Sequence, residues 1–405
     1  MTHLFRSLFL GGFECSTHRR RDGHRLDLIR ASRHDEFAGA DYQRLAAQGI
    51  LAARDGVRWH LVETAPGQYN WDSALPLIRA ARQAQLQVIW DLCHYGWPDD
   101  LDLLSPAFVD RFAAFARAFA HVLASETEAV PFVCPINEIS FFAWAAGEVG
   151  YIHPFVQCRG SELKAQMVRA SIAGIEAIWE VDPRARMVHV DPVVHVVPHT
   201  ERPYERSQAE GYCRAQYDAW DMLAGHAAPH LGGDPRYLDL IGVNYYPHNQ
   251  WVYHAGAGFN PEFAIPRSDP RYRPFRELLH EVWDRYRRPT FIAETGHEGE
   301  ARAEWLRYIA GEARAALHEG VPLEGICLYP IVDHPGWDDE RYCPNGLWAY
   351  ADDAGVRPIY PPLAEELARQ QSWFAAIQDQ RRVPGHAPCR SVTAHSEPLE
   401  GPQEP

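Results

Sequence analysis

Short apolar runs alternate with long stretches of helical periodicity along most of the chain. The short runs are rich in β-branched residues, which favours buried strands, and the stretches between them repeat apolar residues at a spacing of three and four. Repeated strand–helix units of this kind are typical of a parallel sheet. The expected strands are residues 8–13, 57–62, 87–92, 131–136, 186–190, 238–244, 290–293 and 325–328. Eight such units predict the α/β fold class and, within it, a single (β/α)8 TIM barrel.

The stretches between these runs carry helix signals. Ser105 followed by Pro106 is a typical helix start, and the next turns place Phe108, Phe112 and Phe119 on one face, where they should pack against the barrel. Further helices are expected over residues 72–83, 161–180, 212–224, 276–286, 300–317 and 363–377.

The chain is expected to form one catalytic domain, residues 1–380, followed by a flexible tail, residues 381–405. The tail is rich in Pro, Ser, His and Glu and has few large apolar side chains, so it cannot bury enough surface to offset its ordering entropy. The loops over residues 245–270 and 333–345 are long and aromatic. Long loops after barrel strands usually shape a substrate pocket.

Charge and cysteine content limit the function classes. The 39 basic and 54 acidic side chains give a formal net charge of −15, which argues against binding of nucleic acid or of an anionic membrane. No run approaches the roughly 18 apolar residues of a membrane span, and the N-terminus lacks the features of a signal peptide. The eight cysteines form no CxxC pair, so we expect free thiols and a cytoplasmic location.

Two glutamates stand at the ends of predicted strands. Glu138 follows the apolar run that ends at Asn137, and Glu294 follows residues 290–293. Parallel strands of a barrel bring their carboxyl ends to one rim, so these side chains should meet there. Cleavage of a glycosidic bond needs two carboxyl groups around one anomeric carbon, one protonated and one charged. The pair therefore predicts a retaining glycoside hydrolase.

The chain also resembles the glycoside hydrolase family 1 β-glucosidases, which belong to the clan A (β/α)8 barrel hydrolases. No single motif is specific, but their number and order from about residue 8 to residue 374 are. The matching pieces are Gly12-Phe13, Arg58-Trp59, His94-Tyr95-Gly96-Trp97-Pro98, Asn137-Glu138, Gly150-Tyr151-Ile152-His153-Pro154, Asp239-Leu240-Ile241-Gly242-Val243-Asn244-Tyr245-Tyr246, Glu294-Thr295-Gly296 and Gly346-Leu347.

The resemblance implies a role for each candidate site residue. Glu294 would be the nucleophile and Glu138 the acid/base. Arg58 and Tyr246 would support the nucleophile, although Arg58 could instead form a structural ion pair and Tyr245 competes with Tyr246. The remaining expected substrate-binding residues are His94 and Asn137, which would bind sugar hydroxyls, and Trp337, which could stack on a sugar or cap the barrel.

The chain departs from the family pattern where the family binds the sugar. The first loop, residues 15–23, lacks the expected glutamine and contains Arg19-Arg20-Arg21, which could bind an anionic sugar or form a solvated face. Gly336 stands where the family has a glutamate, and Ile139 replaces a proline after Glu138. The cleavage residues are therefore expected to be kept while the sugar specificity is altered.

Two other functions compete with this prediction. A non-catalytic sugar-binding barrel could share the fold. A metal-dependent barrel hydrolase is suggested by His189, Asp191, His195 and His199, but Pro198 separates the last two and no HxH pair follows the first strand. We expect no cofactor, no metal, a small carbohydrate or glycoside as the partner and no nucleic acid. The oligomeric state is open.

Overall fold

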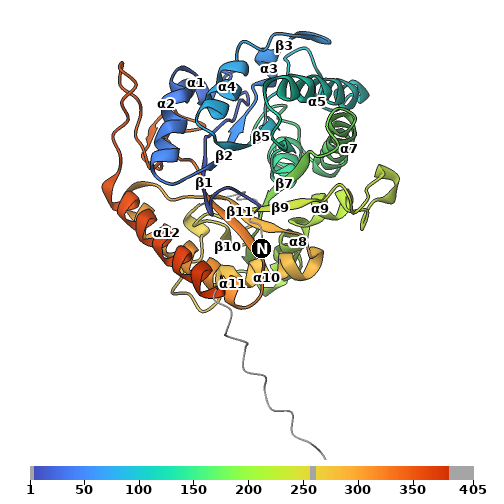
Figure 1. Ribbon diagram of the computed structural model, residues 1–405. Helices are drawn as coiled ribbons and strands as arrows, with labels where there is room; N and C mark the ends of the chain where they lie inside the picture. Colours follow the sequence, from blue (N-terminus) through green and yellow to red (C-terminus); the bar gives the residue numbers. More distant parts are fainter. Residues whose placement is uncertain (1–3, 256–260, 383–405) are drawn as a thin grey trace, which may run out of the picture.

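The computed structural model describes residues 4–255 and 261–382, and eight parallel strands close into a barrel at its centre (Figure 1). Around the barrel the strand order is β1, β12, β11, β9, β7, β6, β5, β2. The strands are β1 (Phe9–Gly12), β2 (Ala52–Gly56), β5 (Gln87–Cys93), β6 (Phe132–Ile136), β7 (Arg186–Pro192), β9 (Leu240–Asn244), β11 (Thr290–Thr295) and β12 (Leu323–Leu328). The predicted (β/α)8 barrel is confirmed.

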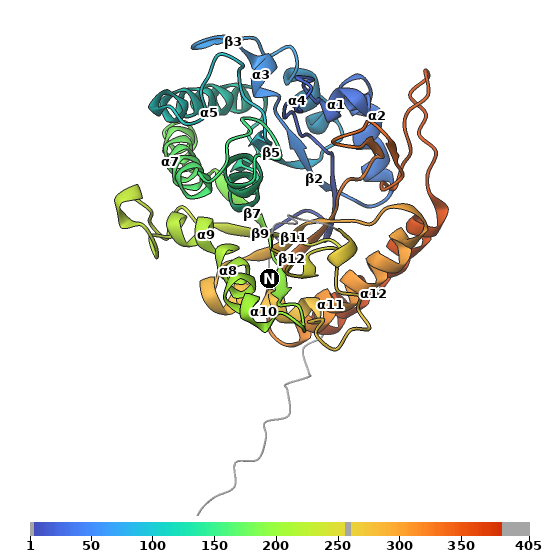
Figure 2. The ribbon, with the colours of Figure 1, turned by 180° about the vertical axis from the view of Figure 1, so that it is seen from behind.

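Helices surround the barrel, and both views show them as an outer layer (Figures 1 and 2). They are α1 (Leu28–Ala31), α2 (His34–Ala47), α3 (Trp59–Val62), α4 (Leu75–Gln83), α5 (Pro106–Glu126), α6 (Ile139–Phe142), α7 (Gly160–Trp179), α8 (Arg206–Ala215), α9 (Asp218–Leu223), α10 (Phe275–Tyr286), α11 (Arg302–His318) and α12 (Pro361–Arg382). A π-helical turn, Ala143–Glu148, follows α6. None of the described helices is long and apolar enough to cross a bilayer.

The remaining strands form three small sheets outside the barrel. These pair β3 (Glu63–Ala65) with β4 (Gln68–Tyr69), β8 (His195–Val197) with β10 (Gln250–Val252), and β13 (His334–Pro335) with β14 (Tyr342–Cys343). The last two sheets lie in loops that follow barrel strands.

Apolar side chains fill the barrel and bind the helices to it. The ring of Phe5 lies 5.0 Å from that of Phe291 and 5.8 Å from that of Phe132, in a buried cluster drawn from all the barrel strands. On α5, the predicted phenylalanine stripe is buried, with Phe108 and Phe119 fully inaccessible. Because the barrel interior is largely apolar, the polar side chains of a site are expected near the ends of the strands.

The second predicted strand is wrong. Residues 52–56, Ala-Ala-Arg-Asp-Gly, form β2, whereas most of the predicted run 57–62 lies after the strand and forms α3. Trp59 of α3 stacks on Phe115 of α5 with ring centroids 5.1 Å apart, so its apolar character serves helix packing. In β2, Arg54 and Asp55 are buried because partners satisfy their charges: Arg54 bonds to Asp91 of β5, and Asp55 bonds to His34 of α2.

The domain and tail boundaries stay predictions, because most of the expected tail lies outside the described residues. Helix α12 continues to Arg382, past the predicted boundary at residue 380, and residues 383–405 lie outside the described part of the chain. The expected helix over 212–224 is instead two helices, α8 and α9, separated at Gln216 and Tyr217.

Candidate active site

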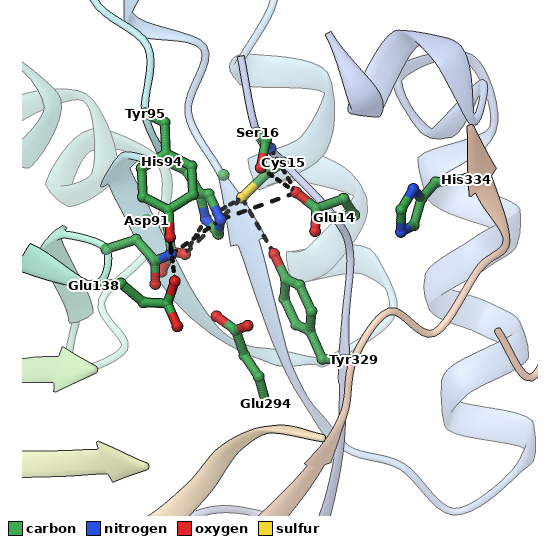
Figure 3. Close-up of polar contacts among 12 residues, drawn as sticks. Glu14, Cys15, Ser16, Asp91, His94, Tyr95, Glu138, Glu294, Tyr329 and His334 are labelled. Atoms are coloured by element: carbon green, nitrogen blue, oxygen red, sulfur yellow. Dashed lines mark hydrogen bonds and ion pairs between the residues drawn. The ribbon is translucent and has the colours of Figure 1, made fainter. Parts of the chain in front are cut away.

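The two predicted glutamates come together at one end of the barrel. Glu294 lies in β11 near its carboxyl end, and Glu138 follows β6 by two residues. Figure 3 shows their carboxyl groups pointing toward one another. Only 5% of Glu294 and 8% of Glu138 is exposed, so both groups lie in surroundings largely shielded from water.

Two side chains, the Arg54 guanidinium and the Tyr246 phenol, donate hydrogen bonds to the Glu294 carboxyl group. Arg54 Nη1 donates to Glu294 Oε1 over 2.8 Å, and the Tyr246 hydroxyl donates to Oε2 over 2.9 Å. Arg54 is fully buried, which makes the charge-assisted hydrogen bond strong. Tyr246 thus lies where the sequence predicted, whereas the Tyr245 hydroxyl bonds to Tyr272 and Gln250.

Among the described residues, the hydrogen-bond donors to Glu138 are neutral. The Tyr95 hydroxyl donates to Oε2, and Asn244 Nδ2 donates to Oε1 over 2.8 Å. The Glu138 backbone has a φ of 44°, a left-handed conformation that is uncommon for a residue with a side chain. The chain is held there from β7, where Val190 accepts the Glu138 N–H and the Asp191 carboxylate accepts the N–H of Ser140 over 2.9 Å.

Their surroundings set the charge of the two carboxyl groups. Burial raises the pKa of Glu294 to about 7, while Arg54 acts to lower it, and burial also raises the pKa of Glu138. Two facing carboxyl groups share protons as a pair. Of the two carboxyl groups, Glu294 is the one that accepts a hydrogen bond from Arg54, so the guanidinium favours the charged form of Glu294 more than that of Glu138.

Asn137 and His94 belong to a buried hydrogen-bond network beside the two glutamates. Asn137 Oδ1 accepts from Arg54 Nη2 over 2.9 Å, and Asn137 Nδ2 lies 3.0 Å from both His94 Nε2 and the Tyr95 hydroxyl. His94 Nδ1 lies 3.0 Å from Asp91 Oδ2. Both predicted sugar ligands therefore reach the site, and direct contact with a sugar stays a prediction for each of them.

One group of ligand-type side chains in the described part of the chain could hold a metal ion. Cys15, Asp91 and His94 place sulfur, oxygen and nitrogen atoms within 4.8 Å of one another. However, Asp91 Oδ2 is already bound by Arg54 Nη2 at 2.6 Å, and burial raises the pKa of the Cys15 thiol well above its ordinary value. A cation would have to displace the guanidinium, so the group fits a metal poorly.

The prediction that Arg58 supports the nucleophile is wrong. Arg58 Nη1 bonds to Asp35 over 2.9 Å and to Asp27 over 3.2 Å, which is the structural ion pair considered as its alternative. Arg54 takes the expected place because β2 begins and ends earlier than the apolar pattern indicated.

Trp337 lies over the site next to the first loop. Its ring is 4.8 Å from that of His18 and 5.7 Å from that of Tyr95, the residue that donates to Glu138. Trp337 is half-buried, so it is placed to cover a sugar or to cap the barrel, and its stacking role stays a prediction.

The arginines of the first loop face acidic and backbone groups of neighbouring loops. Arg19 pairs with Asp99, and Arg20 pairs with Asp22 and with Glu340. None of the contacts described for these arginines reaches Glu138 or Glu294, so binding of an anionic sugar by this run stays a prediction.

The histidines of the competing metal hypothesis do not form a ligand group in the described residues. His189 Nε2 bonds to the carbonyl of Tyr237 at 2.9 Å, and burial lowers the pKa of His189 to about 4. His195 lies in β8, outside the barrel.

Sequence reasoning missed several site residues. Arg54, Asp91 and Asn244 lie in barrel strands, and Glu14 and Tyr95 follow strands. Tyr95 and Asn244 are part of motifs that carried the family resemblance, so their position directly after or at the end of a strand was the available signal.

Comparison with known proteins gives a structural answer only. No protein-family model matches the chain, and no curated protein matches its sequence. A family 1 β-glucosidase from Thermotoga maritima is similar in structure, with a TM-score of 0.71, 15% identity, and coverage of 91% of this chain and 98% of that one. The Thermotoga maritima β-glucosidase in complex with glucoimidazole gives a TM-score of 0.70 and 15% identity, covering 95% of this chain and 100% of that one.

A third similar structure is the AHE enzyme from Alicyclobacillus herbarius. Its TM-score is 0.72 and its identity 16%, with 93% of this chain and 100% of that chain covered. Likeness at this level of identity establishes the fold, in agreement with the family resemblance of the motifs. The chain therefore has the (β/α)8 barrel fold of the family 1 β-glucosidases.

Proposed function

We propose that the protein is a retaining β-glycosidase that acts on a small glycoside. The observation that carries the proposal is the asymmetric pair of carboxyl groups: Glu294 accepts from the cationic Arg54, and the facing Glu138 carboxyl group accepts from the neutral Tyr95 and Asn244. One charged and one protonated carboxyl group are what double displacement requires. The shared fold of β-glucosidases, one of them in complex with glucoimidazole, supports a carbohydrate ligand.

The reaction would proceed in two steps. Glu294 attacks the anomeric carbon while Glu138 donates its proton to the departing oxygen, which leaves a glycosyl ester on Glu294. Glu138, now a carboxylate, then takes a proton from water, and the water oxygen attacks the same carbon and releases Glu294. Arg54 and Tyr246 orient the nucleophile throughout. The proposal uses no cofactor and no metal.

We also propose a cytoplasmic setting. The seven cysteines in the described residues are all free, and four of the thiols are buried in or beside the barrel. Such thiols fit a reducing compartment.

A screen of nitrophenyl β-glycosides tests the proposal. We expect turnover of at least one β-glycoside and, because the ester cannot form, a loss of several orders of magnitude in Glu294→Ala. Glu312→Gln, a change on α11 far from the strand ends, is the matched control and should keep its rate. Saturable sugar binding without turnover would instead support the non-catalytic barrel, and activity lost on chelation would support the metal-dependent hydrolase.

A further inference from the structure

Glu14 is a further carboxyl group of the site, beside Glu138, Glu294 and Asp91, and has no part in the proposed reaction. It follows β1 by two residues, and 9% of its side chain is exposed. Its Oε1 accepts the N–H of Ser16 over 2.9 Å and the Ser16 hydroxyl, and it lies 3.9 Å from His94 Nε2. Figure 3 draws Glu14 between His94 and His334, in the same group of side chains as Glu138 and Glu294.

No lysine or arginine in the described part of the chain forms an ion pair with Glu14. The buried guanidinium of the site, Arg54, is shared by Glu294 and Asp91. With Glu138 protonated, the three carboxylates Glu14, Asp91 and Glu294 face one arginine. The walls of the site therefore carry an excess of negative charge, and a cleft of one sign attracts ligands of the other.

His94 could balance the charge of Glu14 by taking up a proton, but this would cost a hydrogen bond from Asn137. Arg54 donates to Asn137 Oδ1, which fixes the amide so that its Nδ2 donates toward His94 Nε2. A nitrogen that accepts carries no proton, so this hydrogen bond favours a neutral His94 with its proton on Nδ1, facing Asp91, although, against the effect of burial, Asp91, Glu14 and Glu294 raise the pKa of His94. Protonation of His94 would neutralise Glu14 but would break the contact with Asn137.

A second residue of the first loop has a polar atom without a partner. His18 is 1% exposed, and its Nδ1 has no hydrogen-bond partner within the part of the chain that the structure describes. Burial lowers the pKa of His18 to about 4 although the charge of Glu14 opposes this, so His18 is neutral and lies within the field of Glu14. Buried polar atoms without partners are costly, and a ligand group that reaches Nδ1 of His18 beside Trp337 would satisfy this atom.

We propose that Glu14 binds a protonated amino group on the sugar, so that the substrates are amino-deoxy β-glycosides. This inference rests on the proposed function and names its substrate class. An ammonium group both donates to the carboxylate and neutralises it, whereas a sugar hydroxyl donates without removing the excess charge. A sugar carboxylate or phosphate would be repelled by the same three groups.

Kinetics on matched substrate pairs test the assignment. Nitrophenyl β-glucosides with an amino group in place of the 2-, 3-, 4- or 6-hydroxyl are compared with the parent glucoside. We expect at least one amino substrate to exceed its parent at least tenfold in kcat/KM. In Glu14→Gln the ratio of that amino substrate to the parent should fall at least tenfold, while in Glu312→Gln it should stay unchanged. A ratio is independent of the fraction of folded enzyme, so partial misfolding of the variant does not obscure the result.

The outcomes separate this inference from the proposed function. Turnover of neutral glycosides with no preference for any amino substrate overturns the role of Glu14 alone. An amino preference that Glu14→Gln keeps also overturns it. Absence of turnover for every glycoside, neutral and amino, overturns both proposals.

Discussion

Arg54 on β2 reaches across the barrel to Glu294 on β11, which is not a neighbouring strand, and its Nη1 donates to the carboxylate Oε1 over 2.8 Å. The same guanidinium donates through Nη2 to Asp91 and Asn137, so one side chain ties β2, β5, β6 and β11 together at the site. The Arg54 guanidinium is fully buried, and its planar set of N–H donors fixes the position of the Glu294 carboxyl group and favours its charged form. The proposed nucleophile is thus held by a residue four positions before the arginine that the sequence pattern favoured.

Replacement of Arg54 by lysine should reduce kcat/KM by a factor of about 100 or more, because an ammonium group cannot serve three acceptors in the fork geometry. Steady-state kinetics on an aryl β-glycoside measures the loss. Arg58→Lys is the matched control, since Arg58 contacts Asp27 and Asp35 rather than Glu294, and it should lose less than threefold. Equal losses in the two variants would contradict the assignment.

Substitution of Tyr246 should affect activity, whereas substitution of its neighbour Tyr245 should affect stability. Tyr246→Phe removes the hydroxyl that binds Glu294 and should lower kcat by a factor of about 10 to 100. Tyr245→Phe removes a buried bond to Gln250 and should cost about 1 kcal/mol of unfolding free energy with kcat nearly unchanged. Kinetics and chemical denaturation of both variants test this pair, and the reverse pattern would assign the nucleophile contact to Tyr245.

Glu294 should destabilise the fold at neutral pH. Burial raises its pKa to about 7, above the ordinary value of 4.5, so the folded state binds more protons than the unfolded state between these values. Stability from this group therefore falls as pH rises through that window, by up to about 3 kcal/mol. Glu294→Gln should be more stable than the native protein above pH 7, and the difference should vanish below pH 4.5.

Denaturation curves across this pH range measure the effect. Glu126→Gln is the control of opposite sign, because the hydrogen bond from Arg79 lowers the pKa of Glu126 and its charge favours the folded state at neutral pH. A stability difference for Glu294→Gln that does not change with pH would contradict the burial of a charged Glu294.

Asp191 should act as a positioning residue for the acid. It accepts the N–H groups of Ser140 and Phe141 at the start of α6, directly after Glu138. Asp191→Asn weakens these bonds, so kcat should fall more for substrates with poor leaving groups, which need the proton most, than for dinitrophenyl glycosides. Asp239→Asn, which loses a pair with Arg186 before β9 begins, should show no such dependence on the leaving group. The same loss for all leaving groups would assign Asp191 a structural role.

The sequence predicted the barrel strands wherever the buried residues of a strand are apolar. All expected barrel strands except the second lie within a few residues of their predicted places, and they carry Glu138 and Glu294 to one rim. The second strand was missed because Arg54 and Asp55 are buried through partners distant in the sequence or on a helix, Glu294 of β11 for Arg54 and His34 of α2 for Asp55, and such pairing leaves no periodic signal in the sequence. Glu14 was missed for a similar reason, since only folding brings it beside His94.

Trapping of the glycosyl-enzyme tests the central claim most directly. A 2-deoxy-2-fluoro β-glycoside with a good leaving group should form a stable ester, and peptide mass spectrometry should locate it on Glu294 with one sugar per chain. Glu294→Gln should remain unlabelled, and Glu138→Gln, which can still be glycosylated by an activated substrate, should label. A sugar ester on any other residue, or turnover of the parent glycoside without a trapped intermediate, would contradict the account.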